Sequence, residues 1–133
     1  LPLRMERHFE NAKQVCALLE QSDRVSKVFY SGSPNHPQRE LIEKQMYGSS
    51  GVLSFVLDCD RDGTKRFIDA LHHVNLGGTW GTYESTIQTT DTTPGFTPNT
   101  EYSTLLPHHC RLSVGLEDID VILSDLDQAL KAI

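Results

Sequence analysis

The end of the chain constrains the fold most, because a strand pattern is followed at once by a long helix pattern. In residues 110–114 apolar and polar side chains alternate, which is typical of a strand with one buried face. In residues 116–133 apolar side chains instead recur at steps of three and four, which predicts an amphipathic helix with Glu117 and Asp118 in its first turn. Each element has a single apolar face, and a sheet covered by helices buries both.

Periodicity predicts three further helices. One face of the first carries Met5, Phe9, Ala12, Cys16 and Leu19. A second follows the turn-forming residues 31–35, with Pro37 in its first turn, where the missing N–H costs nothing. A third begins at Asp60 or Asp62, either of which can cap it, and continues to Val74, just before a glycine-rich loop.

Strands are expected between these helices. Residues 24–30 and 83–89 are candidates, and the nearly continuous apolar residues 52–57 predict a central strand buried on both faces. Residues 89–100 are rich in Thr, Pro, Gly and Asn, which indicates a long loop. The order of elements favours an α+β fold, a two-layer α/β sandwich with helices packed on one side of a small, mostly antiparallel sheet. A chain of 133 residues fits a single domain.

Composition excludes several classes of partner. The net charge of -6 and the scattered cations argue against binding to nucleic acid, which requires a clustered basic face. No uncharged stretch is long enough to cross a membrane, and we expect a cytoplasmic protein. Cys16, Cys59 and Cys110 are odd in number and widely separated, which indicates buried thiols in a reducing compartment.

Two groups of potential metal ligands have weak spacing. The adjacent histidines 72–73 and 108–109 diverge on any regular element, so a zinc site is not expected. The alternating aspartates of residues 58–62 lack the terminal glutamate of a calcium loop, and helix capping explains them better. Glu84 and Ser85 have no histidine in a recognisable relation to them, so we expect a structural role there.

Two segments together carry a resemblance to a known family. Residues 77–85 read Gly-Gly-Thr-Trp-Gly-Thr-Tyr-Glu-Ser, and residues 111–118 read Arg-Leu-Ser-Val-Gly-Leu-Glu-Asp. With residues 32–38 and 51–55 upstream in the same order, nearly the whole chain resembles the C-terminal domain of the fold-type I pyridoxal-phosphate (PLP) enzymes of cysteine and methionine metabolism. Because of Trp80, the first segment looks most like that of the cystathionine β-lyases among these enzymes.

The resemblance implies that residues 1–133 are the C-terminal domain of a larger enzyme. The PLP-binding domain and its Schiff-base lysine would precede Leu1, which is not a methionine, and no segment of the chain resembles that lysine region. The implied activity is a carbon–sulfur lyase that converts cystathionine to homocysteine, pyruvate and ammonia, acting as a homotetramer. The 133-residue chain alone would bind no cofactor and would be inactive.

Site residues follow from the same resemblance. In the family the arginine at the position of Arg111 holds the substrate α-carboxylate, Thr79 stands where a serine contacts that carboxylate, and Trp80 shapes the pocket. A guanidinium suits this role because its planar fork matches a carboxylate with two parallel hydrogen bonds. Spacing alone shows only an arginine on the polar face and favours a surface arginine on a half-exposed strand. Gly77, Gly78 and Gly81 would let the loop approach a ligand closely.

Two alternatives remain open. Cystathionine γ-synthases, γ-lyases and sulfhydrylases have similar C-terminal domains, so the reaction can differ within the family. A stand-alone α+β module that binds an amino acid or a protein without catalysis also fits a chain that has no cofactor site of its own.

Overall fold

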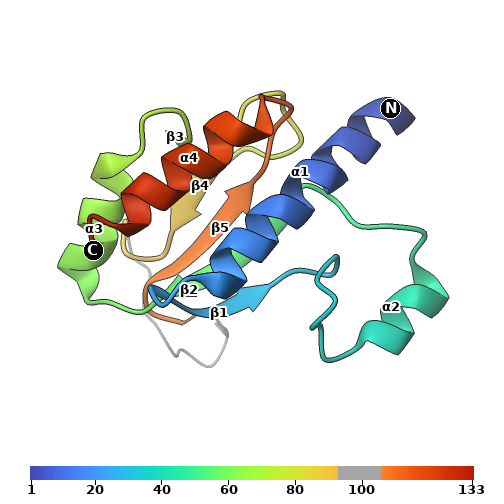
Figure 1. Ribbon diagram of the computed structural model, residues 1–133, viewed down its shortest axis with the longest axis horizontal. Helices are drawn as coiled ribbons and strands as arrows, with labels where there is room; N and C mark the ends of the chain where they lie inside the picture. The colour runs from blue at the N-terminus through green and yellow to red at the C-terminus, as the bar shows by residue number, and fades with distance from the viewer. Residues whose placement is uncertain (93–105) are drawn as a thin grey trace.

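The computed structural model describes residues 1–92 and 106–133. Their sheet has the strand order β1-β2-β5-β4-β3, and every pairing is antiparallel except that of β3 with β4 (Figure 1). This confirms the predicted α+β fold with a mostly antiparallel sheet. The elements in chain order are α1 (Pro2–Gln21), β1 (Val25–Phe29), α2 (Arg39–Gln45), β2 (Val52–Leu57), α3 (Arg61–Ala70), β3 (Asn75–Leu76), β4 (Thr86–Thr89), β5 (His109–Ser113) and α4 (Ile119–Leu130).

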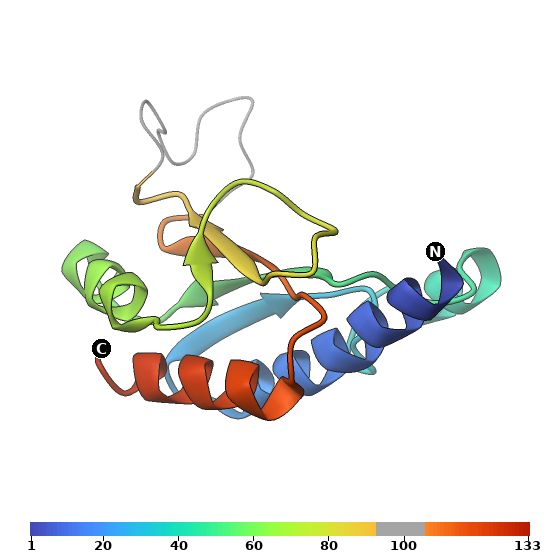
Figure 2. The same ribbon diagram turned by 90° about the horizontal axis from the view of Figure 1, so that it is seen from above.

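One face of the sheet forms the core. Leu112 of β5 lies between Leu53 of β2 and Ile87 of β4, and all three are at most 2 % exposed. Figure 2 shows α1 and α4 along this face, while the loop between β3 and β4 lies on the other side of the sheet. Cys110 is also fully buried, so the alternation predicted for the last strand is confirmed. Residues 52–57 form an interior strand, as expected.

Helix α1 packs on the sheet through its C-terminal half. Its predicted apolar face is buried from Ala12 onward, but Met5 is 39 % exposed because the first turns extend past the sheet (Figure 1). Helix α4 also contributes buried residues to this core. Helix α3 contributes Phe67, whose ring meets that of Phe55 edge to face, with 6.1 Å between the ring centres. The buried residues of α4 are Ile122, Asp125, Leu126, Ala129 and Leu130.

The third helix is shorter than its periodicity predicts. It begins at the predicted cap, where the Asp60 carboxylate accepts from the backbone N–H of Gly63 at 2.7 Å. It ends at Ala70 rather than at Val74. The carboxylate of Asp125 on α4 accepts hydrogen bonds from the backbone of the three residues that follow, His72, His73 and Val74. A buried acceptor from another helix therefore replaces the helical carbonyls as partner of these N–H groups.

Two other helix starts differ from prediction. Helix α4 begins at Ile119, with Asp118 as its cap accepting from the N–H of Asp120, so Glu117 lies before the helix and not in its first turn. Helix α2 begins at Arg39, after Pro37, and none of its residues is buried. Figure 1 shows α2 set apart from the sheet, so packing does not extend this helix toward the proline.

The strands on either side of the glycine-rich loop also differ from prediction. Strand β3 was not predicted, and β4 begins at Thr86 rather than at Tyr83. The predicted loop 89–100 lies largely outside the described residues, and Thr89 belongs to β4. In the described part of the chain no helix combines the length and the apolar content needed to span a membrane.

Candidate functional site

Arg111 stands on the face of the sheet that α1 and α4 leave uncovered. It lies on β5, and its direct neighbours across the sheet are Ser54 on β2 and Gln88 on β4. Successive residues of a strand point to opposite faces, so the buried Cys110 and Leu112 place Arg111 on the polar face. The side chain is half-buried.

The loop between β3 and β4 covers Arg111. We call residues 77–85 the indole loop. One terminal nitrogen of Arg111, Nη2, donates to the carbonyl of Gly78 at 2.8 Å. The guanidinium carbon lies 5.5 Å from the centre of the Trp80 ring, which is the geometry of a cation–π contact. The structure therefore brings Arg111 and Trp80 together from positions that the sequence separates by 31 residues.

The Nε donor of the Arg111 guanidinium has no hydrogen-bond partner among the described residues. This nitrogen is buried, and no acceptor in that part of the chain contacts it. An unpaired buried donor costs about 1–3 kcal/mol, so an added acceptor would relieve a real cost. A carboxylate is the acceptor whose shape best matches a guanidinium.

Thr79 lies in the same loop with an exposed side chain. Its backbone carbonyl accepts from the hydroxyl of Thr86 at 2.8 Å, which holds the loop against β4. Trp80 is 66 % exposed, so its ring covers Arg111 without being buried itself. Gly81 has a φ of 74°, a conformation that favours glycine, and it turns the chain back toward the sheet. All three predicted site residues therefore belong to one surface region.

Other contacts of the indole loop were not foreseen. Arg4 of α1 donates from Nη2 to the carbonyl of Gly81 at 3.1 Å, and the N–H of Gly81 donates to the Ser113 hydroxyl at 3.2 Å. Arg4 is 77 residues away from its partner in the sequence, so no local pattern could indicate the contact. The alternation of β5 placed Ser113 on the face of Arg111, but its burial under the loop required the structure.

His109 is the other titratable side chain on this face of β5. Burial lowers the pKa of its ring, and its Nδ1 has no hydrogen-bond partner among the described residues. The ring lies 5.6 Å from that of Phe29, centre to centre. His109 is therefore neutral near pH 7 and adds no second positive charge beside Arg111.

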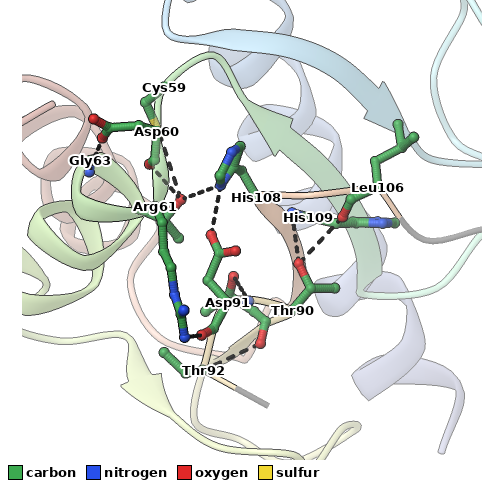
Figure 3. Close-up of polar contacts among 12 residues, drawn as sticks. Cys59, Asp60, Arg61, Gly63, Thr90, Asp91, Thr92, Leu106, His108 and His109 are labelled. Atoms are coloured by element: carbon green, nitrogen blue, oxygen red, sulfur yellow. Dashed lines mark hydrogen bonds and ion pairs between the residues drawn. The ribbon is translucent and has the colours of Figure 1, made fainter. Parts of the chain in front are cut away.

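The two histidine pairs differ in their contacts. The Nδ1 atom of His108 lies 2.8 Å from the Asp91 carboxylate and 3.3 Å from the Thr64 hydroxyl. Figure 3 shows His108 pointing toward Asp91. His73 donates its backbone N–H to Asp125, as described above. Within residues 1–92 and 106–133 no cluster of three or more His, Cys, Asp or Glu side chains could hold a metal ion.

The lysines do not fit an imine-bound cofactor. A lysine that forms an imine with a carbonyl cofactor is usually desolvated, which lowers its pKa and frees the amine. All five lysines of this chain have exposed side chains, and they are Lys13, Lys27, Lys44, Lys65 and Lys131. We therefore derive no step on such a cofactor from these residues.

Comparisons with known proteins identify the family of this chain. The model of the Cys/Met metabolism PLP-dependent enzyme family matches residues 1–131. A cystathionine gamma-lyase of Mus musculus is 41 % identical over 99 % of this chain and 34 % of that protein. A cystathionine beta-lyase of Coxiella burnetii is 38 % identical over 98 % of this chain and 34 % of that protein. The chain thus spans about a third of the length of the curated relatives that it matches.

A solved structure has the same fold. The crystal structure of metB from Corynebacterium glutamicum superposes with a TM-score of 0.88 at 30 % identity, covering 98 % of this chain and 34 % of that one. The family match, the curated relatives and the shared fold lead to one conclusion. The chain belongs to the Cys/Met metabolism PLP-dependent enzyme family.

Proposed function

We propose that this chain is the C-terminal domain of a PLP-dependent carbon–sulfur lyase and that it binds the substrate's carboxylate. The observation that carries the proposal is the position of Arg111, whose guanidinium lies on the uncovered sheet face beneath the Trp80 ring. Its buried Nε has no acceptor among the described residues. An α-carboxylate would pair with this guanidinium and fix the orientation of an amino acid.

Each site residue has a distinct part in this proposal. Arg111 holds the carboxylate by charge and by its fork of donors. The Thr79 hydroxyl, on the exposed side of the indole loop, adds one hydrogen bond to the same group. Trp80 forms a wall that excludes water and strengthens the ion pair, since charges attract more strongly in a less polar environment.

The cofactor belongs to residues outside this chain in the proposed enzyme. Two observations support this: the chain spans about a third of its relatives, and its lysines are all exposed. Bound PLP withdraws electrons from the substrate's α-carbon, whereas this domain contributes binding and orientation.

Replacing Arg111 in the full-length protein tests the proposal. Arg111→Ala removes a charge-assisted contact of about 1.5–3 kcal/mol, which should lower kcat/KM for cystathionine about tenfold to a hundredfold. Arg111→Lys keeps the charge but loses the fork, so we expect an intermediate loss. The measurement is steady-state release of the keto acid.

The matched control is Arg24→Ala. Arg24 is an exposed arginine whose ion pair with Asp23 is remote from the indole loop, so kcat/KM should not change. If Arg111→Ala left kcat/KM at the level of this control, Arg111 would not bind the substrate.

The position of bond cleavage has two candidates. We propose β-elimination first, because Trp80 is most like the β-lyases of the family, and a relative named cystathionine beta-lyase is 38 % identical. γ-Elimination is the second candidate, favoured by relatives named cystathionine gamma-lyase at up to 41 % identity. With cystathionine as substrate, pyruvate indicates β-elimination and 2-oxobutanoate indicates γ-elimination.

A further inference from the structure

The indole loop ends on a buried serine that a single carboxylate holds. Ser85 is 1 % exposed, and both its backbone N–H and its hydroxyl donate to the carboxylate of Glu117, the hydroxyl at 2.9 Å. The same hydroxyl accepts from the backbone N–H of Gly115 at 2.9 Å. Hydrogen bonds to an ionised acceptor are roughly twice as strong as neutral ones. Glu117 therefore fixes the end of the loop that carries Thr79 and Trp80.

The loop crosses the segment after β5 with no free space. A side chain at Gly115 would collide with the carbonyl of Tyr83 and with the Glu117 carboxylate. The backbone N–H of Leu116 donates to the same carbonyl of Tyr83 at 2.8 Å. A shift of the loop along this crossing would break these hydrogen bonds, so the crossing has one register.

Glu117 itself is anchored from the helix layer. Asn11 of α1 is fully buried, and its Nδ2 donates to the carbonyls of Gly115 and Glu117, each at 3.1 Å. The backbone that carries the carboxylate is thus fixed to the core, independently of the loop. Glu117 connects a rigid element to a loop that would otherwise depend on weaker contacts.

Two other long-range contacts of the loop are more exposed to water than those of Glu117, whereas the hydrogen bond from the Gly81 N–H to Ser113 is also partly buried. The hydrogen bonds from Arg111 to Gly78 and from Arg4 to Gly81 are both solvent-exposed. Water competes for exposed hydrogen bonds, so each contributes little to the position of the loop. The contacts of Glu117 are partly buried, and they determine where the loop lies.

We propose that Glu117 is a positioning residue for the carboxylate site. By holding Ser85, it keeps Thr79 and Trp80 over Arg111 and so shapes the site before a ligand binds. This inference rests on the proposed function. Because Glu117 acts on binding rather than on bond cleavage, its loss should raise KM more than it lowers kcat.

The test uses the full-length protein with added PLP and cystathionine. Glu117→Ala removes both acceptors, and a displaced loop should lower kcat/KM roughly tenfold to a hundredfold, mainly through KM. The quenching of Trp80 fluorescence by acrylamide should rise, measured after subtraction of a Trp80→Phe protein. Circular dichroism verifies that the variant is folded.

Two further variants make the result specific. Glu117→Gln should recover most of the wild-type KM, because its amide oxygen can accept from the Ser85 N–H while its NH₂ donates to the Ser85 hydroxyl. Glu84→Ala is the matched control, since Glu84 is an exposed carboxylate of the same loop. In the described part of the chain, Tyr83 is the one side chain that hydrogen-bonds to the Glu84 carboxylate. It should change neither KM nor quenching.

The outcomes separate this inference from the proposed function. If Arg111→Ala raised KM while Glu117→Ala changed neither KM nor quenching, the positioning role would be wrong. A Glu117→Gln protein as poor as Glu117→Ala would also overturn it, because charge rather than hydrogen bonding would then matter. If Glu117→Ala does not fold, Ser85→Ala takes its place in the test. This variant keeps the hydrogen bond from the backbone N–H of residue 85 to Glu117 but loses that of the hydroxyl, so KM should rise roughly threefold to tenfold. An unchanged KM there refutes the inference.

Discussion

The buried carboxylate of Asp125 joins α4 to the segment that follows α3. It is 3 % exposed and accepts from the backbone N–H groups of His72, His73 and Val74 at 2.8, 2.9 and 2.9 Å. In Asp125→Asn one oxygen becomes an NH₂ group, which faces N–H donors and cannot accept from them. The Oδ1 atom also accepts from Nε2 of Gln128 at 3.1 Å, so each carboxylate oxygen accepts two hydrogen bonds, and either orientation of the amide loses two of the four.

The expected loss of stability follows from these contacts. A hydrogen bond to a charged acceptor contributes about 1.5–3 kcal/mol, so losing two lowers the free energy of unfolding by about 3–5 kcal/mol after some relaxation. A domain of this size has about 5–15 kcal/mol in total. Asp127→Asn on the same helix is the control, because its exposed pair with Lys131 should contribute less than about 1 kcal/mol.

The effect depends on pH with a defined sign. Burial alone raises the pKa of Asp125, but the hydrogen bonds from the backbone of Val74, His72 and His73 outweigh it and leave the pKa below its ordinary value. A carboxyl with a lowered pKa in the folded state stabilises the fold above the unfolded-state value of about 4. This contribution is lost as the pH falls through the pKa of the folded state.

Urea unfolding followed by far-ultraviolet circular dichroism measures both quantities. The difference between the wild type and Asp125→Asn should be constant from about pH 6 to 8 and should shrink below about pH 4. A difference under about 1 kcal/mol at pH 7, equal to the Asp127→Asn control, would refute the assigned role of the three hydrogen bonds.

Two further predictions concern the thiols and catalysis. Burial raises the pKa of Cys16 to about 11 and of Cys110 to about 12, so at pH 7.5 a thiol reagent should modify the half-buried Cys59 first and the other two only after unfolding. Mass spectrometry of the labelled peptides identifies the order, and early labelling of Cys110 would contradict it. The 133-residue chain with added PLP and cystathionine should release no pyruvate, because all five lysines are exposed. Sustained release by the purified chain would show that a complete catalytic site lies within it.

The sequence predicted the elements well where a single face decides burial. The alternation of residues 110–114 and the three-four steps of residues 116–133 both describe what neighbouring side chains do. β5 confirms the first, and α4 confirms the second over Ile119–Leu130. The cap at Asp60 was predictable for the same reason, since a cap and its partner lie three residues apart. Such patterns need no knowledge of distant segments.

Prediction failed where a distant side chain replaced a local partner. The spacing of apolar residues predicts that α3 continues to Val74. Instead Asp125, 51 residues away, accepts the N–H of Val74, and the helix ends at Ala70. Glu117 reads as a first-turn residue of α4, yet its carboxylate is bound by Ser85, 32 residues before it. In both cases a hydrogen bond between a carboxylate and a distant segment outweighs the preference of the local chain.

In the candidate site, too, local features were predictable from the sequence and contacts between distant residues were not. The sequence by itself determined that Arg111 lies on the polar face of its strand and that residues 77–85 form a glycine-rich loop, because both follow from local alternation and backbone freedom. Only the tertiary structure decided that Trp80 lies over Arg111, that Glu117 accepts from Ser85 at the end of the loop, and that Arg4 contacts Gly81. Contacts between residues more than 30 positions apart depend on how the sheet and helices pack, and that packing comes from the whole core rather than from any one segment.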